Sequence, residues 1–103
     1  MNFDLVIKGG EVVDPGSGLL GRMDVGIRGG VIAAVDRSLP TEGVGSTLDA
    51  TGLVVTPGLF DLHTHIRTQP MPLSYVYYLK LAMGVTTMVP ASDRGVDSAL
   101  TQA

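Results

Sequence analysis

The sequence has 103 residues and a mass of 10.7 kDa, which suits one small domain or a part of a larger one. Seven basic residues against ten acidic ones give a net charge of −3, so we expect no nucleic-acid partner held through its phosphates. The hydrophobic fraction of 45% argues against disorder, and the lack of cysteine excludes disulfides and thiolate metal sites.

A secretory signal consists of a basic segment followed by an apolar stretch, and the chain does not start with this pattern. It also lacks the run of about 18 apolar residues that a membrane-spanning helix needs. We therefore expect a cytoplasmic protein that does not associate with a membrane.

The first half is rich in glycine and contains short β-branched stretches, a pattern typical of small strands and turns. Two similar segments each place a Gly-Gly pair between apolar residues, Gly9-Gly10 and Gly29-Gly30. Each pair predicts a two-residue hairpin turn, because glycine adopts the positive φ that such turns require. The expected cross-strand neighbours are Lys8 with Glu11, Ile7 with Val12, and Ile27 with Ile32.

The second half predicts a strand, a helix and a second strand in that order. Residues 59–66 favour a strand, 73–83 a helix that follows two prolines and ends before Gly84, and 85–89 a buried strand. Two shorter strands are expected before them, at 47–50 and 53–56. A strand–helix–strand unit joins parallel strands, so the sequence predicts an α/β fold.

The chemistry-bearing residues lie on the first of those strands. Because side chains alternate faces along a strand, Asp61, His63, His65 and Arg67 are predicted to share one face. Leu62 and its alternate neighbours would then lie on the other face, in the layer under the helix. Two imidazoles spaced two residues apart on a strand can converge on one cation, and Asp61 could be a weaker ligand or orient an imidazole.

This H-x-H pair has two interpretations. Histidines two residues apart also occur on solvated strands, where they have no function. The position at the end of the first strand of a βαβ unit, where α/β folds place their sites, favours the metal interpretation.

The segment "TPGLFDLHTH" resembles the P-G-[FL]-[IVF]-D-x-H-x-H signature of the metal-dependent amidohydrolase superfamily. The earlier segments "VIKGGEVVDP" and "VIAAV", and the later "GVTTMV", are similar to its neighbouring elements. The resemblance implies a small β-sandwich built on a TIM-type (β/α)8 barrel, with His63 and His65 binding a divalent metal, usually zinc. It implies hydrolysis of a C–N bond, in a cyclic amide or N-acyl compound, by a metal-activated water.

Arg67 makes the pattern D-x-H-x-H-x-R, which is similar to the dihydroorotase-like branch, where the arginine holds a substrate carboxylate. The chain departs from that branch after the second barrel strand, where a Pro-Asn-Thr-like segment is replaced by Pro90-Ala91-Ser92-Asp93. This departure weakens the case for dihydroorotate itself. Arg67 could alternatively be a solvated strand end.

The family's complete site adds a lysine, two further histidines and an aspartate from later strands, and this sequence has only two histidines. We therefore assign no catalytic residue within the chain and expect it to be the N-terminal portion of a longer enzyme, inactive alone.

Residues 1–56 would belong to the sandwich and 57–103 to the first βαβ unit of the barrel. The expected partners are a small-molecule substrate and further copies of the chain in a homo-oligomer. Two other functions remain open, a nucleobase-type deaminase and an inactive binding or assembly module.

Overall fold

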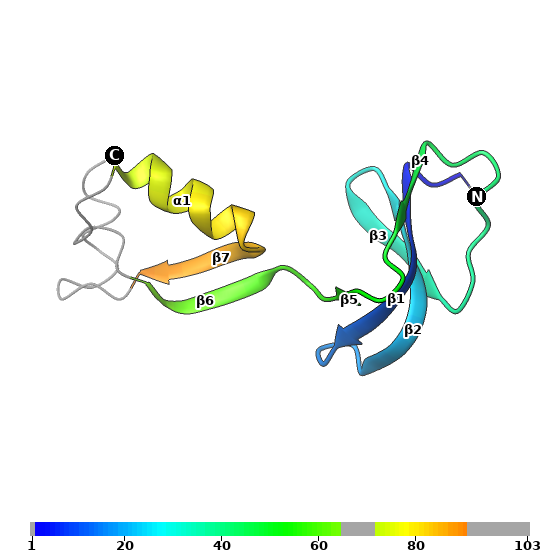
Figure 1. The fold of residues 1–103 in the computed structure, drawn as a ribbon, viewed down its shortest axis with the longest axis horizontal. Coiled ribbons are helices and arrows are strands. Elements are labelled where there is room, and N and C mark those ends of the chain that lie inside the picture. Colours follow the sequence, from blue (N-terminus) through cyan, green and yellow to red (C-terminus); the bar gives the residue numbers. More distant parts are fainter. Residues whose placement is uncertain (1, 65–71, 91–103) are drawn as a thin grey trace. The chain divides into compact units, whose positions relative to one another are not determined.

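The computed structural model describes residues 2–64 and 72–90. The chain divides into two compact units, Met1–Pro57 and Gly58–Ala103. Along the chain the elements are β1 (Leu5–Asp14), β2 (Leu19–Arg28), β3 (Val31–Asp36), β4 (Ser46–Asp49), β5 (Val54–Val55), β6 (Leu59–Thr64), α1 (Leu73–Ala82) and β7 (Val85–Pro90) (Figure 1).

The first unit contains a five-stranded sheet in the order β3-β2-β1-β4, with β5 also paired to β1. β1 runs antiparallel to β2 and parallel to β4 and β5. Its buried apolar side chains are valine or alanine apart from one aromatic ring, and they are Phe3, Val6, Val12, Val25 and Ala50. The short strands after β3 are confirmed, although β4 is shifted by one residue from its predicted range and β5 is shorter than predicted. That this sheet belongs to a β-sandwich stays a prediction.

The prediction of a hairpin turn at Gly9-Gly10 is wrong. β1 continues through both glycines as one ten-residue strand, and its register with β2 shifts between Ile7 and Gly10. Gly9 has φ +68°, which a bulge in a strand can use as readily as a turn can. The strand continues because the Asp24 carboxylate accepts the Gly9 N–H at 2.8 Å, a contact made between residues far apart in the sequence.

The turn between β1 and β2 lies further along, at residues 15–18. There the Asp14 carboxylate accepts the N–H groups of Gly16 and Ser17 at 3.1 and 3.3 Å. The segment Asp-Pro-Gly-Ser-Gly carries the ordinary signals of a turn, so the sequence contained the correct hairpin loop.

The second Gly-Gly hairpin is confirmed. Gly29 and Gly30 have φ +59° and +78°, and they connect β2 to β3. Ile27 faces Ile32 across the strands, as predicted.

The second unit has the predicted strand–helix–strand order, and β6 pairs parallel to β7. Gly58 makes this pairing possible just before β6, because a Cβ there would lie 2.1 Å from the Thr86 Oγ1. α1 ends one residue before the predicted limit, and Gly84 follows it with φ +81°, a common conformation after a helix C-terminus. Predicted strand residues 65 and 66 lie outside the described residues.

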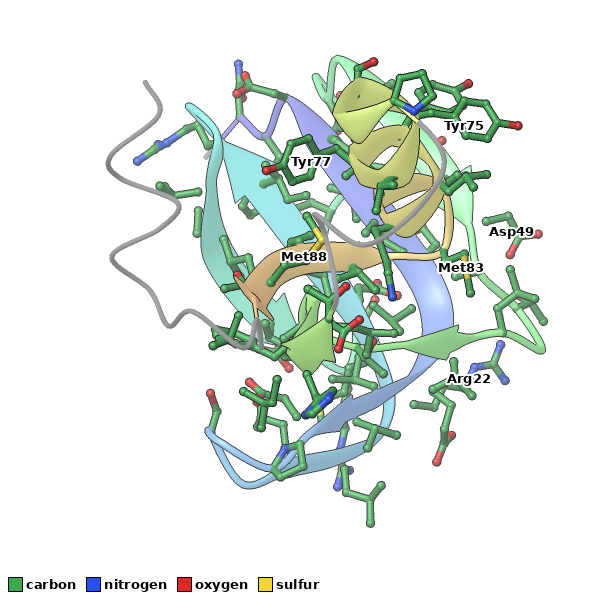
Figure 2. The ribbon with its side chains drawn as sticks, turned by 90° about the vertical axis from the view of Figure 1, so that its left-hand side faces the viewer. Arg22, Asp49, Tyr75, Tyr77, Met83 and Met88 are labelled. Carbon is green, nitrogen blue, oxygen red and sulfur yellow. The ribbon has the colours of Figure 1, made fainter. Side chains whose placement is uncertain are left out.

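α1 buries one of its described side chains and exposes most of the others. Val76 is 7% exposed, whereas Tyr75 and Tyr77 are 51% and 43% exposed. The two tyrosines lie on opposite sides of the helix (Figure 2). In residues 2–64 and 72–90, no helix is long and apolar enough to cross a membrane.

Candidate metal site

The candidate site lies on β6, the strand that precedes α1. His63 is exposed near the end of this strand, and the Asp61 side chain is 20% exposed. The register between β6 and β7 shifts between Asp61, which pairs with Met88, and Thr64, which pairs with Pro90. The candidate residues therefore lie where the regular ladder is interrupted.

The prediction that Leu62 lies in a buried layer under the helix is wrong, because Leu62 is 71% exposed. Thr64, predicted on the same face, is only 5% exposed. Strict alternation of faces requires a regular strand, and the register shift after Asp61 removes that regularity.

Asp61 holds two different groups with its two carboxylate oxygens. Lys80, from the last turn of α1, donates to Oδ2 at 2.5 Å, and the backbone N–H of His63 donates to Oδ1 at 3.1 Å. The hydrogen bond from the Lys80 ammonium, followed by that from the His63 N–H, lowers the pKa of Asp61 below its ordinary value. Asp61 is therefore ionised at neutral pH and fixes the backbone of His63.

Lys80 is the residue at this site that no sequence motif indicates as functional. It lies 19 residues after Asp61 and on another element. No local motif links the two positions, so only the packing of α1 against the strands brings them together.

His65 and Arg67, the second predicted metal ligand and the predicted substrate-binding residue, lie outside the described residues. Within the described ranges 2–64 and 72–90, no group of three or more His, Cys, Asp or Glu side chains could hold a metal. The roles of Asp61, His63, His65 and Arg67 stay predictions.

The donor chemistry fits a divalent metal as part of a larger ligand set. His63 is an exposed residue near a strand end, and an imidazole is a preferred ligand of zinc. Asp61 already bonds to Lys80 and to the His63 backbone, so its contacts favour support of His63 over direct coordination.

No protein-family model matches the chain. Among curated proteins, the chain is 41% identical over 65 residues to a dihydroorotase of Trichlorobacter lovleyi, covering 63% of the chain. It is 36% identical over 87 residues to adenine deaminase 2 of Rhizobium etli, covering 84% of the chain. The chain spans about 15% of the length of each of these relatives.

Among solved structures, the chain resembles an N-acyl-D-glutamate deacylase from Bordetella bronchiseptica, crystallised with zinc and a phosphonate inhibitor. The TM-score is 0.69 and the identity 30%, over 89% of this chain and 19% of that one. These likenesses support the metal-dependent amidohydrolase superfamily as the family to which the chain belongs. The relatives act as hydrolases, and the zinc in the solved neighbour supports a divalent metal in the family.

Proposed function

We propose that the chain forms the N-terminal part of a metal-dependent amidohydrolase that cleaves a C–N bond in a cyclic amide or N-acyl compound. The observation that carries this proposal is His63, exposed near the end of the first strand of a parallel βαβ unit, with its backbone held by Asp61. The zinc-containing deacylase supports zinc as the metal. In this proposal, the first unit belongs to a β-sandwich and the second begins a (β/α)8 barrel that is completed by residues outside this chain.

Three groups of this chain have distinct roles in the proposed site. His63 and His65 would hold the metal through their imidazoles, and Arg67 would pair with an anionic group of the substrate, for which a guanidinium is well suited. When bound, the metal supplies Lewis-acid activation of a water molecule for attack on the substrate. The Asp61 carboxylate accepts the His63 N–H, so the backbone that carries this imidazole is held in place.

A deaminase is the second candidate function. The likeness to adenine deaminase 2 extends over 84% of the chain, against 63% for the dihydroorotase. Deamination and amide hydrolysis both proceed by attack of water at a carbon bonded to nitrogen. The substrate therefore distinguishes the two candidates better than the metal does.

The test uses both this chain and the longer protein that we propose. The longer protein is assayed with a cyclic ureide, an N-acyl amino acid and adenine, before and after removal of metal with a chelator. We expect turnover of one of the first two substrates, lost with the chelator and restored by zinc. Turnover of adenine alone would establish the deaminase, and no turnover by a protein that binds zinc would indicate an inactive binding module.

The 103-residue chain is expected to hydrolyse none of these substrates, because it lacks the further ligands and the general base. Calorimetry with zinc is expected to show weak binding, reduced more than about tenfold in His63→Ala and in His65→Ala, since losing even an outer-shell partner costs about 10- to 100-fold. Tyr78→Ala, an exposed substitution on α1, is the control and should bind zinc as the wild type does. Equal binding by all these variants would contradict the proposed site.

A further inference from the structure

We propose that Lys80 is a positioning residue for the metal-binding end of β6. It acts through Asp61, which in turn holds the backbone of His63. This inference rests on the proposed function, because it assigns Lys80 a purpose only if His63 binds a metal.

The contacts form a chain from the helix to the candidate ligand. The Lys80 ammonium lies 2.5 Å from Asp61 Oδ2, and the two side chains are only 30% and 20% exposed. The other carboxylate oxygen accepts the His63 N–H. One carboxylate therefore connects α1 to the backbone of the predicted ligand.

The interruption in the sheet explains why this connection is needed. Between Asp61 and Thr64 the register of β6 with β7 shifts, so the backbone at His63 is not fixed by a regular ladder. The Asp61 side chain holds it instead. A carboxylate held on one oxygen by Lys80 keeps the rotamer in which its other oxygen faces the His63 N–H. Without Lys80, the carboxylate can rotate about its χ angles and release that N–H.

Whether loss of Lys80 raises or lowers the metal affinity distinguishes a positioning role of this residue from a direct effect of its charge. Lys80 carries a positive charge near the site, and removing a positive charge should by itself strengthen the binding of a cation. Loss of positioning should weaken it, since partners behind a metal-bound histidine contribute about 10- to 100-fold in metal affinity. We therefore expect Lys80→Met to bind zinc at least about tenfold more weakly than the wild type. Lys80→Arg should recover most of the loss, because arginine keeps a charge-assisted bond to the carboxylate.

The chain offers a matched control in its only other lysine, Lys8, which pairs with Asp24 at 2.6 Å in the first unit. Lys8→Met removes an ion pair of the same kind and should lower the melting temperature without changing the zinc affinity. Calorimetry with zinc and thermal melts of the metal-free chain are measured on the wild type and all three variants. Hydrogen exchange at the His63 amide of the metal-free chain adds a readout that does not involve the metal, and we expect its protection to fall in Lys80→Met alone.

The outcomes distinguish this inference from the proposed function. If the wild type binds no zinc, the metal site of the proposed function is overturned, and this inference with it. If the wild type binds zinc and Lys80→Met binds it equally or more tightly, the positioning role alone is overturned. A loss of affinity that also occurs in Lys8→Met would likewise overturn it, because the loss would then follow general stability.

Discussion

Asp24 shows how a single side chain determines the local structure of the first unit. This aspartate is 3% exposed and accepts hydrogen bonds from Lys8 Nζ at 2.6 Å, Gly9 N at 2.8 Å and Leu39 N at 2.8 Å. Lys8 also donates to the Leu39 carbonyl at 3.1 Å. The carboxylate therefore fixes both the bulge in β1 and the segment that follows β3.

Replacing Asp24 by alanine is expected to destabilise the first unit by roughly 2–4 kcal/mol, because the substitution leaves an ammonium and two N–H groups without their acceptor. Asp36→Ala is the matched control, since Asp36 is exposed and its carboxylate accepts a bond from the adjacent Arg37 N–H. Urea denaturation of both variants measures the difference. Equal free energies of unfolding for the two variants would show that the hydrogen bonds to Asp24 make no net contribution to stability.

The pH dependence of stability should report the same carboxylate. Burial raises the pKa of Asp24, but hydrogen bonds from Lys8, Leu39 and Gly9 together outweigh burial and lower it below the ordinary value. A lowered pKa in the folded state means that the stabilisation is present above the unfolded pKa of about 3.9 and is lost as the pH falls through the folded pKa. Melts of the wild type below about pH 4 should therefore show a loss of stability that is smaller in Asp24→Asn. The same acid dependence in both proteins would contradict this assignment.

At the scale of elements, Gly58 permits the close approach of β6 and β7. A Cβ at this position would lie 2.1 Å from Thr86 Oγ1 and 2.5 Å from its Cγ2. Gly58→Ala is expected to destabilise the second unit by about 1–3 kcal/mol, the usual cost of overpacking. Thr86→Gly should restore part of the loss in the double variant. Gly16→Ala, in an exposed turn with ordinary φ, should cost less, because the nearest atom to a Cβ there is Asp14 Oδ1 at 3.3 Å. A double variant no more stable than Gly58→Ala would show that the clash is not the cause.

The order and type of most elements could be predicted from sequence because the signals are local. The turn glycines at Gly29-Gly30, the helix between prolines and Gly84, and the β-branched run of β7 each carry their own pattern. Gly9-Gly10 shows the limit of such patterns. It has the same local pattern as the true hairpin, and the Asp24 carboxylate that makes it a bulge lies 15 residues away.

The candidate site could be predicted in part for the same reason. The spacing of His63 and His65 is a local pattern, so the sequence indicates both. The Lys80–Asp61 pair depends on how α1 packs, and the exposure of Leu62 depends on a register shift, neither of which a two-residue alternation can predict.

At the scale of the whole molecule, the second unit exposes many large apolar side chains. They are Leu59, Phe60, Leu62, Tyr75, Tyr77, Tyr78, Leu79, Leu81, Met83 and Val89. Its described sheet has two strands, and two strands with one helix bury little apolar surface. Exposed apolar surface and unpaired strand edges both favour association with another chain.

We therefore expect the 103-residue chain to form oligomers or aggregates, measured by light scattering coupled to size exclusion. Leu81→Glu should reduce the association, because Leu81 is 65% exposed on α1, whereas Leu20→Glu is a control at a similarly exposed position in the first unit. A compact monomer of 10.7 kDa with a cooperative melt would show that the chain closes its own core.

We propose that the H-x-H pair formed by His63 and His65 binds a divalent metal. X-ray absorption at the zinc edge of the zinc-loaded chain tests it most directly, because imidazole ligands give a distinct scattering signature. We expect two histidine nitrogens at about 2.0–2.1 Å from the zinc, reduced to one in His63→Ala and in His65→Ala. A zinc environment made only of oxygen, or one that neither substitution changes, would contradict it.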